Sequence, residues 1–461
     1  MTPWLPDYIA RLYDEFFADY KSAPFAQWHD ESLNVIKTHL GGLTREPHAA
    51  VAKLERYVAT SSDDLQKRRF HVLLAISTAF GDVGGIRNQD GSCSDGWKEI
   101  RRQWVAEGNL LREETGHLLP RDRRGQAWAW KRPERGSVAD YLQNFVRCPL
   151  AATPNLSIRV KVLPDSGLRS EILRVGIVPL VASADDLEMV PDRSRSATLR
   201  FSVRPKSPDA IREAALNALD EAAAAECDLV LFPELCLTAE IQAALSERRK
   251  KLGARARPWL VVAGSAYVPV GGGSSAGHYN QSIVLDRDGK TILTHHKLHP
   301  YTMSMPELDR YEIGEALEWL ACTEALETDP YQIEVLDTSA GRIAVLICED
   351  LSTEDFVRPL VEKLGLDWLL VPVLDGCQME RRWTAHCGTK YAEKGAAVIV
   401  ATSLSLASAQ WRKLDDPKSS QPGVGTIVIP PNQHDPKPRV RTHIVYGDAH
   451  DRPWICDLPL R

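Results

Sequence analysis

The sequence predicts an α/β domain that follows a mostly α-helical N-terminal region. Apolar residues recur at three- and four-residue spacing through the first 150 residues, which is the period of amphipathic helices. Later in the chain, short β-branched runs alternate with amphipathic stretches, as in a sheet covered by helices. The 461 residues also exceed what one hydrophobic core usually organises. We therefore expect a helical domain at 1–150, a linker at 151–171 and the α/β domain at 172–461.

The predicted elements can be placed along the chain from these patterns. In the N-terminal region we expect helices at 8–17, 33–40, 51–58, 65–80, 95–107 and 138–146. In the α/β region we expect helices at 211–225 and 381–393, and strands at 173–180, 229–232, 260–263, 282–286, 292–294, 332–337, 342–347, 368–373, 397–402 and 425–429. Residues 182–195 are rich in Asp, Ser and Arg, and we expect them to form a loop near the functional site.

Composition and charge exclude several classes of protein. The formal net charge of −6 and the pI near 6.1 give the whole chain no long-range attraction for nucleic acid or anionic membranes. No stretch approaches the roughly 18 apolar residues of a membrane helix, and the N-terminus is acidic rather than signal-like. Nine cysteines without a CxxC pair indicate neither a disulfide framework nor a structural zinc site. We therefore expect a cytoplasmic protein that does not span a membrane.

Three apolar segments end in residues that could carry out chemistry. The predicted strand 229–232 is followed by Glu234, at the sheet edge where ligands of α/β proteins bind. A hairpin ends in His-His-Lys297-Leu-His, and the strand 342–347 is followed by Cys348, which such a strand end would hold exposed. Hydrolysis of an amide through a covalent intermediate needs a nucleophile, a group that moves its proton and donors for the oxyanion. The three segments supply these parts.

In order, spacing and flanking residues, these segments resemble the nitrilase, or carbon-nitrogen hydrolase, superfamily. The resemblance runs from residue 172 to the C-terminus and includes the strand 369–372 and the turn 392–395 after the cysteine. It implies a four-layer αββα sandwich for this part of the chain. The N-terminal helical domain carries no resemblance that we recognise.

The resemblance implies a role for each of the three residues. Glu234 would be the general base, Lys297 would polarise the oxyanion, and Cys348 would attack the substrate. Beside an ammonium, the thiol is expected to become more thiolate-like, and the backbone N–H of Glu349 would be a second oxyanion donor. This chemistry requires no metal and no cofactor.

Further site residues are predicted around the lysine. Many members of the family carry a second glutamate shortly after the lysine, which positions substrate and water. Glu307 is the candidate here, and Glu312 is the alternative. Tyr301 and Glu349 are predicted to contact the substrate. The three histidines around the lysine lack a carboxylate or thiolate at ligand spacing, so we expect no metal site there.

The sequence thus predicts a hydrolase of carbon-nitrogen bonds that forms a thioester at Cys348. The Cys348-Glu-Asp run is similar to the glutaminase branch of the family and favours a small-molecule amide or carbamoyl substrate over a nitrile. Two alternatives stay open. The chain could be a nitrilase-like binding or regulatory module whose helical domain recruits a protein or nucleic acid, or an enzyme that transfers the acyl group to an amine or alcohol.

Partners are predicted for two surfaces. The resemblance implies a homo-oligomer, because family members often pair their outer helices across a two-fold axis. Residues 121–135 hold six basic residues beside two tryptophans, a pattern that can bind single-stranded nucleic acid, although a solvated surface or a protein contact would also explain it.

Overall fold

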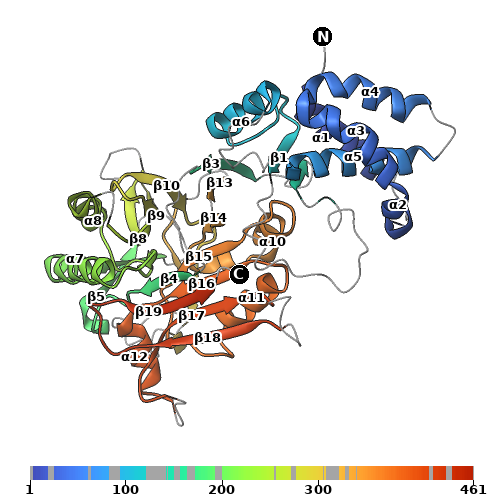
Figure 1. The fold of residues 1–461 in the computed structure, drawn as a ribbon. Coiled ribbons are helices and arrows are strands. Elements are labelled where there is room, and N and C mark those ends of the chain that lie inside the picture. The colour runs from blue at the N-terminus through green and yellow to red at the C-terminus, as the bar shows by residue number, and fades with distance from the viewer. Residues whose placement is uncertain are drawn as a thin grey trace.

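The computed structural model places a helical bundle beside a larger sandwich of two sheets (Figure 1). The structure describes residues 4–18, 25–60, 64–82, 94–120, 142, 144–149, 156–163, 172–192, 200–253, 256–270, 277–304, 306–307, 321–327, 332–338, 340–414, 419–431 and 439–459. The basic segment 121–135 and Glu312 lie outside these residues.

The N-terminal part is helical, as predicted. Its central helix is α5 (Leu65–Asp82), which packs against all of the first four helices. Most of α5 is buried, since a helix surrounded by other helices carries apolar residues on nearly all sides. The other helices are α1 (Leu5–Ala18), α2 (Phe25–Glu31), α3 (Leu33–Arg45), α4 (Pro47–Thr60) and α6 (Asp95–Glu107).

The helix predicted at 138–146 is wrong at its C-terminal end. Phe145 and Val146 lie in strand β2 (Phe145–Pro149), which pairs antiparallel with β1 (Gly116–Pro120). Residues 138–141 and 143 lie outside the described residues. The first four residues of β2 are all buried, and a short apolar run that is covered on both faces has no periodicity that separates strand from helix.

Two sheets form the larger part of the molecule. The strand orders are β10-β9-β8-β7-β4-β19 in the six-stranded sheet and β18-β17-β16-β15-β14-β13-β3 in the seven-stranded sheet. The first contains β4 (Ile172–Ile177), β7 (Leu229–Leu231), β8 (Leu260–Pro269), β9 (His278–Leu285), β10 (Thr291–His296) and β19 (Trp454–Pro459). The second contains β3 (Ser157–Val162), β13 (Gln332–Thr338), β14 (Gly341–Val345), β15 (Trp368–Pro372), β16 (Ala397–Ala401), β17 (Gly423–Ile429) and β18 (Arg441–Tyr446).

The sheets pack face to face and carry helices on their outer faces. Leu231 and Val262 of one sheet share an apolar core with Leu370 and Ile399 of the other. Helices α7 (Pro208–Ala224) and α8 (Ala239–Leu252) cover the six-stranded sheet. Helices α10 (Glu354–Glu362) and α11 (Trp383–Ala392) cover the seven-stranded sheet. A further helix, α12 (Leu404–Trp411), follows β16. These four layers confirm the predicted αββα sandwich.

Strand β3 lies inside residues 151–171, the stretch expected to be a linker. It forms the parallel edge of the seven-stranded sheet next to β13. The helical part contacts it directly, because Gly108, which follows α6, has a φ of 65° and sits against the carbonyl of Val160. Arg342 of β14 also donates hydrogen bonds to the carbonyls of Pro120 and Leu364. The two parts share a continuous hydrophobic core, so a boundary between independent domains stays a prediction.

An accessory four-stranded sheet adjoins the sandwich. Its order is β11-β12-β6-β5, with β5 (Leu187–Asp192), β6 (Arg200–Pro205), β11 (Thr302–Ser304) and β12 (Ala321–Glu324). The loop expected at 182–195 therefore contains a short 3-10 helix at Ala184–Asp186 and the strand β5, and 193–195 lie outside the described residues. The expectation of a plain loop is wrong for β5, whose register with β6 is continuous.

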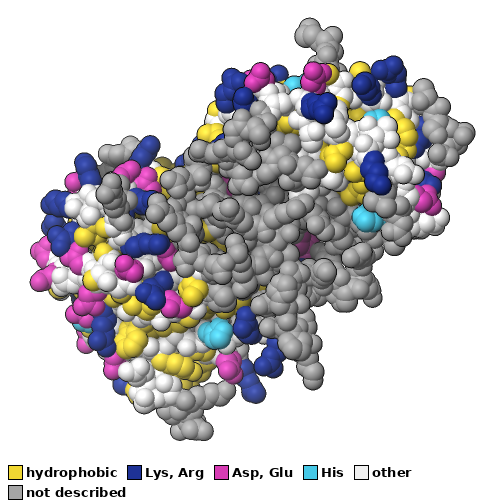
Figure 2. Space-filling model, viewed as in Figure 1, with side chains coloured by type: hydrophobic (Ala, Val, Ile, Leu, Met, Phe, Trp, Pro, Cys, Tyr) yellow, Lys and Arg dark blue, Asp and Glu magenta, His cyan; other side chains and the backbone are white. Residues whose placement is uncertain are grey.

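The described surface mixes charges of both signs. Figure 2 shows Lys and Arg side chains next to Asp and Glu side chains over both parts of the molecule. Among the described residues, no helix is long and apolar enough to cross a membrane.

Candidate active site

Glu234 lies in a tight turn just after β7. Leu235 has a φ of 52°, and its backbone N–H donates to Ser265 Oγ at 3.1 Å. Gly264 makes this turn possible: its φ is 46°, and a Cβ there would lie 2.2 Å from the carbonyl oxygen of Pro233. A second contact fixes the side chain, because Leu374 N, at the end of β15, donates to Glu234 Oε2 at 2.7 Å. The carboxylate is therefore held between the two sheets.

Lys297 directly follows β10, and its ammonium reaches the glutamate. Its backbone N–H continues the ladder by donating to the carbonyl of Asn280 at 2.8 Å. Its Nζ lies 2.8 Å from Glu234 Oε1. The lysine side chain is 1% exposed, so this ion pair lies in a low-dielectric interior.

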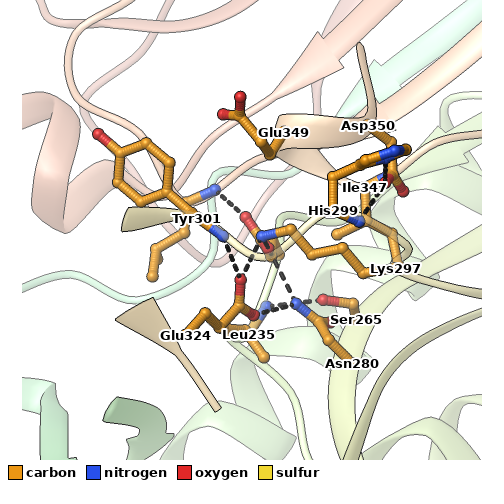
Figure 3. A network of polar contacts seen from close by, with 12 residues as sticks. Leu235, Ser265, Asn280, Lys297, His299, Tyr301, Glu324, Ile347, Glu349 and Asp350 are labelled. Carbon is orange, nitrogen blue, oxygen red and sulfur yellow. Dashed lines mark hydrogen bonds and ion pairs between the residues drawn. The ribbon is translucent and has the colours of Figure 1, made fainter. Parts of the chain in front are cut away.

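Glu324, which the sequence did not indicate, is a second carboxylate on the same ammonium. Its Oε2 lies 2.5 Å from Lys297 Nζ, and Asn280 Nδ2 donates to both glutamates at 2.9 Å (Figure 3). Tyr267 OH and Tyr301 N also donate to Glu324. It is the last residue of β12, so the accessory sheet delivers this carboxylate to the site.

Cys348 follows the apolar strand β14 at a sharp turn. Its φ is 47°, a conformation that residues with a Cβ seldom adopt, and it begins a 3-10 helix, η5 (Cys348–Ser352). The side chain is buried, and its strongest charge interactions are with Glu234 and Lys297. The structure thus brings the three predicted residues into one electrostatic cluster.

Burial controls the ionisation of this cluster. Burial raises the pKa of the Glu234 carboxyl above its ordinary value, and Lys297 opposes this effect only in part. Burial alone would lower the pKa of Lys297, but Glu234 and Glu324 outweigh it and raise that pKa well above its ordinary value. Burial and the charge of Glu234 raise the pKa of the Cys348 thiol, although Lys297 acts in the other direction. Lys297 therefore favours the thiolate, as expected, but burial and Glu234 outweigh its effect in this resting state.

The Glu307 carboxylate accepts hydrogen bonds from Tyr301 and Ser304 and not from the Lys297 ammonium. Its Oε1 accepts a hydrogen bond of 2.5 Å from Tyr301 OH, and its Oε2 accepts from the backbone and hydroxyl of Ser304. Tyr301 is thereby tied to Glu307 by its side chain and to Glu324 by its backbone. Glu349 lies beside the cysteine, where its carboxylate accepts from Ser352 Oγ at 2.6 Å. The second carboxylate against Lys297 is thus Glu324 in this structure, whereas the sequence pointed to Glu307.

The chain matches one protein family over the part that carries these residues. Residues 197–411 match the family model described as carbon-nitrogen hydrolase. The match covers less than half of the chain. The matched segment contains Glu234, Lys297, Glu324 and Cys348, and the N-terminal helices lie outside it. No curated protein matches the chain.

Several solved structures resemble part of the chain at low identity. A mutant of the amidase from Nesterenkonia sp. AN1, with acrylamide added at its active-site cysteine, is 15% identical, with a TM-score of 0.37 over 62% of this chain and 92% of that one. Saccharomyces cerevisiae Nit3, a member of branch 10 of the nitrilase superfamily, is 16% identical, with a TM-score of 0.36 over 60% and 91%. The C. elegans NitFhit protein is 15% identical, with a TM-score of 0.40 over 63% and 61%.

Proposed function

We propose that the chain hydrolyses the carbon-nitrogen bond of a small amide-type substrate through a thioester at Cys348. The observation that supports this most is the buried Lys297 ammonium, which contacts Glu234 and Glu324 and interacts electrostatically with the cysteine. An ammonium held in a dry site is suited to stabilise an oxyanion, because the low dielectric strengthens its effect.

The proposed reaction follows from the charges in the site. The thiol is protonated at rest, so Glu234 takes its proton while the sulfur bonds to the substrate carbonyl carbon. Lys297 and the backbone N–H of Glu349 stabilise the oxyanion. The carbon-nitrogen bond then breaks, and the leaving nitrogen takes the proton from Glu234. Water cleaves the thioester after giving a proton to Glu234, which releases the acid and restores the thiol.

Glu324 has a distinct part in this proposal. Its two oxygens accept from Lys297, Asn280 and Tyr267, so it shares the ammonium and the Asn280 amide with Glu234. We assign it to holding the ammonium in place and to keeping the Glu234 carboxyl at a raised pKa. A base with a raised pKa is better matched to proton transfer near neutral pH.

The test combines intact-mass spectrometry with an assay for ammonia release. Wild type and Cys348→Ala are incubated with a panel of amides, ureido acids and nitriles. We expect an acyl adduct or ammonia release from the wild type alone, and the responding compound identifies the substrate class. An equally active Cys348→Ala protein would refute the mechanism. A wild-type thiol that neither turns over the panel nor reacts with iodoacetamide would favour the binding or regulatory module instead.

A further inference from the structure

The carboxylate of Asp350 accepts five hydrogen bonds in the interior of the molecule. Asp350 is 0% exposed and lies two residues after the cysteine. Its Oδ1 accepts from Leu298 N at 3.0 Å, His299 N at 3.0 Å and His299 Nδ1 at 2.8 Å. Its Oδ2 accepts from His295 Nε2 at 3.0 Å and Ile347 N at 3.2 Å. Figure 3 shows Asp350 facing His299 and Ile347.

The five donors come from the two segments that carry the reacting groups. Four of them lie on the residues that flank Lys297, namely His295, Leu298 and His299. The fifth is the backbone N–H of the residue before Cys348. Lys297 follows the edge strand of one sheet, and Cys348 follows a strand of the other. One carboxylate therefore joins both sheets at the point where the ammonium must meet the sulfur.

The chemistry of this position requires an ionised carboxylate. An ionised carboxylate accepts at both oxygens, whereas an amide of the same shape must turn its NH₂ group toward one set of donors. Burial alone would raise the pKa of the Asp350 carboxyl, but hydrogen bonds from the two histidines outweigh it and lower the pKa. His295 donates through Nε2 to this carboxylate, and among the described residues its Nδ1 has no hydrogen-bond partner.

We propose that Asp350 is a positioning residue, whose carboxylate sets the distance between the Lys297 ammonium and the Cys348 sulfur. This inference rests on the proposed function, since it gives those two groups their roles. Asp350 does not itself act on the substrate. It fixes the backbone on both sides of the lysine and holds the strained turn at the cysteine, where a displacement of about 1 Å can cost about 100-fold in rate.

The experiment compares Asp350→Asn with Asp228→Asn in the full-length protein. Asp228 is a suitable control, because it is 3% exposed, accepts from Arg174 N at 2.9 Å and pairs with Arg257 at the opposite end of β7. The measurements are kcat and KM with the substrate found in the panel, the rate of Cys348 alkylation by iodoacetamide against pH, and thermal stability.

We expect Asp350→Asn to lower kcat about 100-fold with little change in KM, and to move the midpoint of Cys348 alkylation to higher pH. The midpoint moves because a displaced ammonium lowers the pKa of the thiol less than before. The control should lose stability without either change. If Asp350→Asn does not fold, His299→Phe removes one donor and keeps a ring beside Phe356, and it should move both readouts in the same direction by a smaller amount.

The alkylation profile separates this inference from the proposed function. An unchanged midpoint and an unchanged kcat in folded Asp350→Asn would overturn the positioning role. A wild-type protein that turns over no amide would count against the proposed function only. The alkylation midpoint can then still be compared, because it needs no substrate.

Discussion

Replacing Glu324 by Gln tests the part of the site that the sequence did not reveal. The substitution keeps the shape of the side chain but removes the charge opposite Lys297, 2.5 Å away. Hydrogen bonds to charged groups contribute about 1.5–3 kcal/mol and neutral ones about 0.5–1.5 kcal/mol. The substitution therefore weakens the hydrogen bond with Lys297 by about 1–1.5 kcal/mol, and it weakens the hydrogen bond that Asn280 donates by about the same amount. Together they amount to about 2–3 kcal/mol, or about 30- to 160-fold in kcat/KM if the whole loss falls on the transition state.

The pH profile of kcat/KM for Glu324→Gln gives a second prediction, in which the direction of the shift is defined. The charge of Glu324 contributes to raising the pKa of Glu234, so its removal should lower that pKa. The base then stays ionised to lower pH, and the acidic limb of kcat/KM should move to lower pH. Glu334→Gln is the matched control, because Glu334 is also buried and accepts from Lys161 and Thr294 N outside the site. An acidic limb that moves upward, or a kcat/KM equal to that of the control, would refute the reasoning.

Two further variants test the charge balance and the junction between the two parts. Lys297→Met should abolish turnover and destabilise the fold by about 3–5 kcal/mol, because it leaves two carboxylates buried without a cation. The pKa of Glu234, which burial already raises, would lie further above its unfolded-state value without the lysine. Urea denaturation should therefore show a loss of stability that grows as the pH rises, and a loss independent of pH would contradict this account. Gly108→Ala places a Cβ 1.7 Å from the carbonyl oxygen of Val160 and should lower the free energy of unfolding by more than about 1 kcal/mol. Gly395 also has a positive φ, but a Cβ added there would meet no atom within 4 Å. Calorimetry should therefore show a smaller loss of unfolding free energy for Gly395→Ala. Equal losses would mean that backbone strain, and not the contact with Val160, causes the destabilisation.

The three predicted site residues were visible because each follows a short predicted strand. Such strands are local signals, but their ends meet only in the tertiary structure, because β7 and β10 lie in one sheet and β14 lies in the other. The observed strands β7, β10 and β14 end within three residues of Glu234, Lys297 and Cys348. Strand β3 could have been found in the same way, since Ser157–Val162 alternates exposed and buried residues, but its position after the helical region suggested a linker.

Glu324 had no comparable signal. It lies 27 residues after Lys297, in a stretch whose letters fit an amphipathic helix as well as a strand. Its place against the ammonium depends on the pairing of β12 with β6, about 120 residues earlier in the chain. Spacing from the lysine favoured Glu307, which instead accepts from Tyr301 and Ser304.

The four layers were implied by the resemblance to a family. The sequence by itself predicted most strands of the two large sheets and the strand ends that carry the candidate residues. These follow from hydrophobic periodicity, which is a property of neighbouring residues. The tertiary structure decided which carboxylates meet Lys297, how Asp350 joins the two sheets and in which direction the pKa of Cys348 moves. Those outcomes depend on burial and on charges brought together from distant parts of the chain, because electrostatic energies are set by distance and dielectric rather than by position in the sequence.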